Sequence, residues 1–309
     1  MIQLIQEEKE LLNNITKYSK LITSFGQYEH SLISIKILNK MISVQEKLIL
    51  QPDNLLLSYS SLRYVFETLI HTRLMLLESN YVYKIFYFVY VHQVEKTERL
   101  IVRIKKEIEL IEKYVKLEEE GLKKISTLNK TRDEDQIKKI LKEIKDQENI
   151  FDEEAGKEIT MFFGDYKFNG FPYQKIIMEK NLEAFKNKLE ELKSLKTNKA
   201  KEILNDSRIN QYFNFSNQHS KVFTELKESR SWEEKAKIAG LKDEYKQMYE
   251  LSSAILHSTS YSLMTSVDAD EGEKQFSKDL ITRYSKDILN KIKKMLDLEK
   301  LMKINFIEI

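Results

Sequence analysis

The sequence predicts an all-α protein, a helical bundle from which a coiled-coil-like helical hairpin projects. Helix-breaking residues are rare, with two Pro and seven Gly among 309 residues. Apolar residues recur at steps of three and four along most of the chain, which is the helical period. Charged residues make up 32% of the chain and hydrophobic residues 41%, enough to build a core with a solvated surface.

The first three helices are expected at residues 2–24, 27–50 and 54–78. Pro52 ends the second helix, because the residue before a proline resists the helical conformation. Asp53 is suited to cap the third helix, since its carboxylate can accept a free backbone N–H of the first turn.

A long helix is expected next, at 81–128. Apolar residues follow one another in steps of three and four along its middle, a coiled-coil seam: Ile101, Ile104, Ile108, Ile111 and Val115. Thr131 and Glu134 have the spacing of a capping box that opens a second helix to about 150. These two helices predict a hairpin arm.

Residues 151–172 are rich in Gly and aromatic side chains, which indicates a connecting loop. Further helices are expected at 173–205, from the capping box at Ser231 and Glu234 to Gly240, at 241–264 and at 274–303. The domain prediction is a body formed by 1–94 and 173–309, an arm at 95–150 and the loop at 151–172.

Several function classes lack support in the sequence. There is no cysteine, which fits a cytoplasmic location, and the net charge is only +2. The most apolar stretch, 69–91, is interrupted by charged residues, so we expect no membrane span. Phosphate-binding loop motifs and metal-ligand spacings are missing, and in Asp268–Gly272 the glycine stands one position too early for a calcium loop. We therefore expect no cofactor and no metal.

The helix at 54–78 carries one of two polar clusters. Arg63 and Glu67 are four residues apart at the rim of its apolar face, with His71 one turn further. One interpretation is a half-exposed ion pair. The other is a guanidinium held by Glu67 at the wall of a cleft, where its planar fork could bind phosphate.

The helix at 241–264 carries the second cluster. Tyr249, Ser253 and His257 lie beside its main apolar face, on a strip of small hydroxyl residues. His257 is either tied to a neighbouring polar group for packing, or it is an imidazole that acts as general acid or base.

At these residues the chain resembles a bacterial family of all-helical proteins with an Arg-x-x-x-Glu helix early and a Tyr-x-x-Ser-x-x-x-x-His helix late. The matching positions are Arg63, Glu67, Tyr249, Ser252 and His257, the last followed by Ser258. That family is similar to the HEPN superfamily of helical bundles, many of which are metal-independent ribonucleases of toxin–antitoxin and antiphage systems. The HEPN signature places an Arg shortly before a His on one helix, whereas Arg63 precedes His71 by eight positions and His257 has no Arg nearby.

Three functions stay open. In an HEPN-like bacterial defence or toxin-type endoribonuclease, His257 would be general base on an RNA 2′-hydroxyl and Arg63, oriented by Glu67, would stabilise the phosphorane, with Ser253 or Tyr249 assisting. In a non-catalytic interaction module, the arm at 95–150 would bind a second copy or a partner protein. In a small-nucleotide sensor, the Arg63 cleft would hold the ligand.

Overall fold

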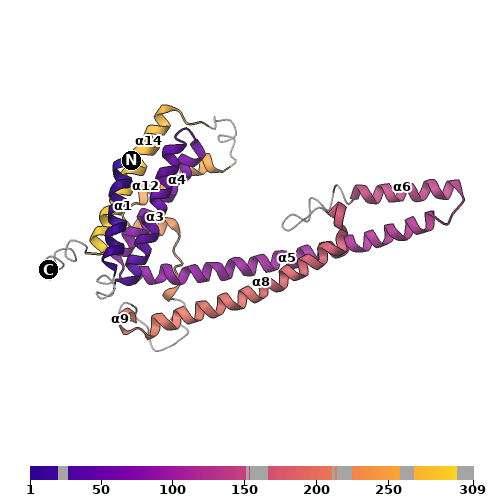
Figure 1. Cartoon of the computed structure of the whole chain (residues 1–309), viewed down its shortest axis with the longest axis horizontal. Helices are drawn as coiled ribbons and strands as arrows, with labels where there is room; N and C mark the ends of the chain where they lie inside the picture. The colour runs from indigo at the N-terminus through magenta and orange to yellow at the C-terminus, as the bar shows by residue number, and fades with distance from the viewer. Residues whose placement is uncertain are drawn as a thin grey trace. The chain divides into compact units, whose positions relative to one another are not determined.

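The structure is a computed structural model and describes residues 1–19, 27–150, 153, 166–210, 213, 225–257 and 268–297 (Figure 1). Within these ranges the chain is helical apart from turns and short connections, and the single β-type pairing is an isolated bridge between Asn54 and Asp268. The all-α prediction is confirmed.

The helices described are α1 (Ile2–Lys17), α3 (Tyr28–Leu50), α4 (Leu55–Leu77), α5 (Tyr81–Leu128), α6 (Glu134–Ile150), α8 (Tyr166–Asn205), α9 (Ser207–Asn210), α11 (Trp232–Ile238), α12 (Lys242–Leu256) and α14 (Glu271–Met295). The predicted bounds of the long helix agree with α5 at both ends. The capping box at Ser231 and Glu234 is formed, and Gly240 follows α11 with φ +68°, as expected for a helix-ending glycine.

Two compact units make up the chain. Unit 1 comprises Met1–Phe88 and Ala200–Ile309, and unit 2 comprises Val89–Lys199, so α5 and α8 each contribute to both. Residues 173–199, which the sequence analysis assigned to the body, therefore belong with the arm. The physical reason is that the apolar side chains of α8 pack along α5.

Unit 1 is built around α4. This helix is apolar on most of its circumference, and its buried residues include Val65, Phe66, Leu69 and Ile70. It packs most extensively against α14, where the rings of Phe66 and Tyr284 lie 5.1 Å apart, and it also contacts α12, α11 and α3. A helix with so few polar positions needs neighbours on several sides, which explains why α4 contacts four other helices of unit 1.

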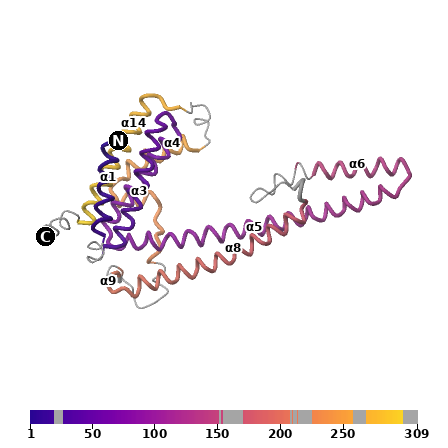
Figure 2. The backbone as a smooth tube through the Cα atoms, viewed as in Figure 1, coloured from indigo at the N-terminus to yellow at the C-terminus, as the bar shows by residue number. Residues whose placement is uncertain are grey.

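Unit 2 has its core along α5 and α8, which run side by side (Figure 2). Ile104, Ile111 and Tyr114 are buried against Phe171 and Met178. A second cluster joins two residues of each helix: Val94, Ile101, Leu189 and Leu192. The predicted seam is thus a packing face, and α8 of the same chain covers it.

Two predicted caps are wrong. Asn54 rather than Asp53 caps α4, and its side chain accepts the N–H of Leu57 at 2.8 Å. Asp53 instead forms a salt bridge with Lys274 at 2.5 Å. At the start of α6 the backbone N–H of Asp135 bonds to Asp133, not to Thr131, because the helix begins later than the capping-box spacing requires.

Most of the predicted loop at 151–172 lies outside the described residues, including the side chains of its aromatic residues up to Phe168. The described part is helical, with a kink at Gly170, whose φ is +70°. Phe171 is buried with its ring 5.2 Å from that of Tyr114, and its N–H donates to Glu118 at 2.9 Å. This end of the region is packed into unit 2.

Candidate functional site

The two motif helices meet in unit 1, because α12 packs against α4. Arg63 on α4 donates from Nε to Glu67 Oε1 at 3.0 Å, and both side chains are partly exposed. The pair has the i,i+4 spacing that brings side chains together on one helix face. The guanidinium is therefore positioned and largely neutralised by its own helix.

Tyr249 on α12 completes this group. Its ring lies below the Arg63 guanidinium, 5.3 Å from ring centroid to Cζ, within the range of a cation–π interaction. The Tyr245 ring is 5.7 Å from that of Tyr249, and burial raises the pKa of Tyr245 above its ordinary value. The structure thus brings Arg63, Glu67 and Tyr249 together from the two predicted clusters.

Ser253 and His257 lie one and two helical turns beyond Tyr249 on α12. The Ser253 hydroxyl oxygen is buried and has no hydrogen-bond partner within the part of the chain that the structure describes. His257 is exposed and is the C-terminal cap of α12. Its backbone N–H donates to the backbone carbonyl of Ser253 at 3.1 Å. Eight residues of helix span roughly 12 Å, so His257 lies at a different level of α12 from the contact between Tyr249 and Arg63. Ser258 of the resemblance motif is outside the described residues.

His71 belongs to a different group, which the sequence analysis did not predict. Its Nδ1 lies 2.8 Å from the Tyr81 hydroxyl, and its ring meets the Trp232 ring edge-on with centroids 5.1 Å apart. Burial, followed by the nearby Lys235 charge, lowers the pKa of His71 to about 4. The imidazole is therefore neutral near pH 7 and acts as a packed aromatic group.

Lys235 was also missed. Its side chain is buried, and its ammonium lies 5.0 Å from the centroid of Trp232 and 6.0 Å from that of Phe88. Burial lowers the pKa of this amine below its ordinary value. The sequence offers no signal for this, because an i,i+3 Trp–Lys pair is equally compatible with a solvated helix surface.

The strongest charge cluster of unit 1 surrounds Arg230. Its guanidinium donates to both carboxylate oxygens of Glu78, at 2.5 and 2.9 Å, and to both oxygens of Glu228, at 2.9 and 2.6 Å. These bonds raise the pKa of Arg230. Burial alone would raise the pKa of Glu228, but its bonds to Arg230 lower it. Four N–H donors of this guanidinium bond to the two carboxylates, so it fastens the chain before α11 to the end of α4.

The described residues offer little support for a metal site or for a membrane span. They contain no group of three or more His, Asp or Glu side chains placed to bind a metal ion. Over the same residues, no helix has the length and apolar character that spanning a bilayer requires. Two cavities occur in unit 1, and neither is lined by Arg63, Tyr249 or His257.

In comparisons with known proteins, no protein-family model, curated protein or solved structure matches the chain.

Proposed function

We propose that the protein is a non-catalytic helical interaction module of the cytoplasm, which self-associates through the distal hairpin of unit 2. The distal hairpin is defined as residues 118–150, the end of α5, its turn and α6. All of these residues are described, and Gln147 is the single buried side chain among them. Eight other positions carry Leu or Ile side chains that stay partly or fully exposed: Leu122, Ile125, Leu128, Ile137, Ile140, Leu141, Ile144 and Ile150.

The proposal rests on the difference between the distal hairpin and the part of α5 that α8 covers. Between 94 and 115, α8 covers the apolar face of α5 and buries Ile104 and Ile111. In the distal hairpin, Ile150 packs against the cluster that contains Phe171 and Met178 of α8, whereas Leu122, Ile125 and Leu141 stay exposed among the described residues. Two helices alone bury too little apolar surface for a stable independent hairpin, so a further helical partner would stabilise it.

The exposed apolar residues gather on one flank of the distal hairpin. Lys124 and Glu143 form a salt bridge at 3.1 Å, and Gly121 lies beside Gln147, so α5 and α6 run antiparallel. When two helices run antiparallel, the residue that directly follows a seam residue points to the same side of the pair, whichever of the two helices it belongs to. Leu122 is 61% exposed, Ile125 42% and Leu141 50%, and this rule puts all three on that side.

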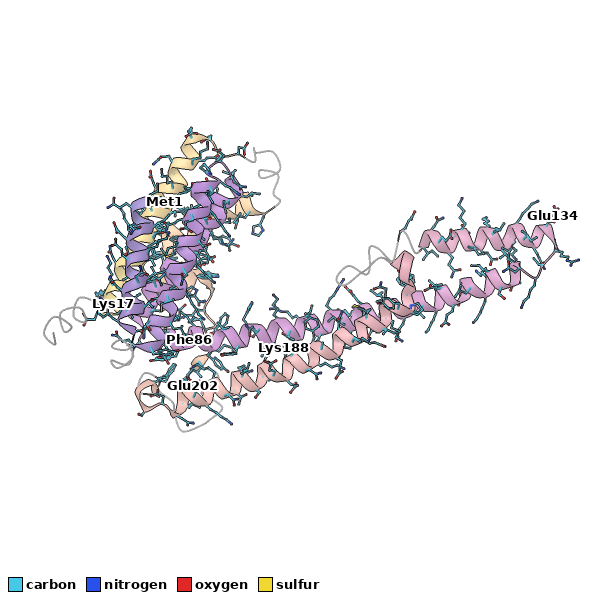
Figure 3. All side chains as sticks on the ribbon, viewed as in Figure 1. Met1, Lys17, Phe86, Glu134, Lys188 and Glu202 are labelled. Carbon is cyan, nitrogen blue, oxygen red and sulfur yellow. The ribbon has the colours of Figure 1, made fainter. Side chains whose placement is uncertain are left out.

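The charges of the distal hairpin favour a second copy as the partner. It contains nine acidic and eight basic residues, with both signs interspersed along both helices. Two copies therefore meet without net repulsion, and antiparallel association can align opposite charges around the apolar flank. Figure 3 labels Glu134 at the start of α6, beside the turn that ends the distal hairpin.

Sedimentation velocity of the full chain tests this proposal. Wild type should dimerise with rising concentration, and the double variant Leu122→Glu/Leu141→Glu should remain monomeric. The matched control, Lys123→Gln/Lys142→Gln, changes the charge by the same amount at neighbouring exposed positions and should dimerise like wild type. A wild-type protein that stays monomeric up to its solubility limit would contradict the proposal.

An HEPN-like, metal-independent ribonuclease of bacterial defence is the second candidate. The observation in its favour is the contact between the two motif helices, which sets the Arg63 guanidinium on the Tyr249 ring. On this proposal Arg63, oriented by Glu67, stabilises charge on the phosphate, and His257 takes the proton of the RNA 2′-hydroxyl. Since His257 lies two turns away along α12, the pair would have to form between copies or after a rearrangement.

RNA cleavage in the presence of a chelator tests this second candidate. Arg63→Ala and His257→Ala should each lower the rate by about 100-fold or more, whereas Arg63→Lys should retain part of it. Equal cleavage by wild type and both folded alanine variants would exclude these roles.

A further inference from the structure

A cavity of about 600 Å³ lies in unit 1, where the first turns of α1, α4 and α14 meet the last turn of α3. Its volume falls within the range of about 300–1,000 Å³ that is typical of small-molecule sites. Its apolar wall is formed by Met1, Ile2, Leu48, Ile49, Pro52 and Ile281, and polar or charged residues of α1, α4 and α14 complete the lining. Ile2 and Ile49 are themselves largely exposed, so the cavity has an apolar mouth that opens to solvent.

One buried hydroxyl faces this cavity. Ser58 of α4 lines it and is only 3% exposed, but its hydroxyl oxygen is not among the enclosed polar atoms that lack a partner. As part of the cavity wall, this hydroxyl can donate a hydrogen bond to a group bound there. Ser277, by contrast, lines the same cavity and donates to the carbonyl of Lys274 at 3.1 Å.

The lining also carries one uncompensated positive charge. Lys274 pairs with Asp53 at 2.5 Å and with Glu271 at 2.7 Å, so these two carboxylates balance its positive charge. Lys278, one turn further along α14, also lines the cavity and forms no salt bridge with any described carboxylate.

Ser58 and Lys278 stand at the same level of the bundle. Asp53, two residues before α4, pairs with Lys274 of α14, and further along Phe66 of α4 meets Tyr284 of α14, so the two helices run parallel. Ser58 lies between Asp53 and Phe66 in the chain, as Lys278 does between Lys274 and Tyr284. Ser58 and Lys278 therefore line the same level of the cavity, whose wall combines apolar and polar residues.

From this arrangement we propose that the cavity binds an amphipathic carboxylate, with its alkyl chain against Ile49 and Ile281 and its carboxylate between Lys278 and the Ser58 hydroxyl. The apolar walls favour the chain by excluding water, and the ammonium and hydroxyl select a negatively charged head group. This inference is independent of the proposed self-association, because every lining residue belongs to unit 1.

Calorimetric titration of the full chain with decanoate, below its micelle concentration, tests the site, with decanol as the uncharged comparison. Wild type should bind decanoate saturably and more tightly than decanol. Lys278→Gln should weaken decanoate binding about three- to fivefold, the size expected for a partly solvated ion pair, and leave decanol binding unchanged. Ile49→Trp at the mouth should prevent binding of both.

Lys286→Gln is the matched control, since Lys286 is an exposed lysine two turns further along α14 that does not line the cavity. It should bind decanoate like wild type. The proposal is overturned if wild type shows no saturable binding, if Ile49→Trp binds as wild type does, or if Lys278→Gln and Lys286→Gln behave alike.

Discussion

In unit 1 the salt bridge between Arg230 and Glu228 leaves 22% and 5% of the two side chains exposed, whereas in unit 2 the pair Lys188–Glu191 leaves 51% and 57% exposed (Figure 3 labels Lys188). The difference follows from the number of neighbours. Helices surround α4 on several sides, so polar groups between them lose water. In unit 2, α5 and α8 share one seam, and most of their charged side chains stay hydrated; Glu107, which pairs with Arg103 at 2.9 Å, is the buried exception among the described pairs. The enclosed pair of unit 1 is therefore expected to matter for stability, and the exposed pair of unit 2 hardly at all.

The largest effect is expected from Arg230→Met, which keeps the length of the side chain but removes the guanidinium that bonds to both Glu78 and Glu228. We expect a loss of about 3 kcal/mol in the free energy of unfolding of unit 1. Urea unfolding followed by the fluorescence of Trp232, the only tryptophan of the chain, measures it. Arg283→Met, at an exposed pair with Glu244, is the control and should cost less than about 1 kcal/mol.

A buried carboxyl of unit 1 provides the next comparison. Glu8 is fully buried and accepts from Gln45 Nε2 at 2.8 and 3.0 Å. Burial, opposed by this hydrogen bond and reinforced by the Glu7 charge, raises the pKa of Glu8 from 4.5 to about 7. The nearby cation of α1, Lys9, is paired with Glu46 of α3 at 2.8 Å on the exposed side.

Since the folded state holds the Glu8 proton more tightly than the unfolded chain does, its contribution to stability is lost as pH rises from about 4.5 to about 7. Relative to Glu8→Gln, wild type should lose about 2–3 kcal/mol between pH 5 and pH 8. The comparison with the variant is needed because His71, with its pKa lowered to about 4, changes stability in the opposite direction below its ordinary value of 6.5. Parallel pH profiles for wild type and Glu8→Gln would contradict the assignment.

In unit 2 the most sensitive backbone position is expected at Gly170. Its φ of +70° disfavours any side chain, and a Cβ there would lie 2.8 Å from a carboxylate oxygen of Glu118. Gly170→Ala should destabilise the contact between α8 and α5 by about 1–2 kcal/mol. Hydrogen exchange of the α5 amides around Tyr114 measures this. Gly240→Ala has the same backbone strain with no atom within 4 Å, so it should cost less.

The smallest effect is expected at the surface of unit 2. Lys188→Ala removes the 2.8 Å pair with Glu191, and the free energy of unfolding should change by less than about 0.5 kcal/mol. Hydrogen exchange of α8 near residue 188 checks it. A loss as large as that of Arg230→Met would show that the two units do not differ in the way proposed.

Local features were predictable where the information lies within a few residues. The bounds of α5, the capping box at Ser231 and the stop at Gly240 depend on neighbouring residues alone. Asp53 was predicted as the cap of α4, but Asn54 takes that place, because Lys274, more than two hundred residues away, binds the Asp53 carboxylate. Arg63 and Glu67 were predicted as a pair for the same local reason, but the stacking of Tyr249 depends on how α12 packs.

The amino-acid order alone determined that this chain is helical and that α5 carries an apolar seam, because the helical period and the scarcity of Gly and Pro act over short distances. Tertiary packing decided which helix covers that seam, which carboxylates surround Arg230, and how far His257 lies from the Arg63 contact along α12. Those outcomes depend on distances between helices far apart in the chain, where many pairings satisfy the same apolar pattern and only packing selects one.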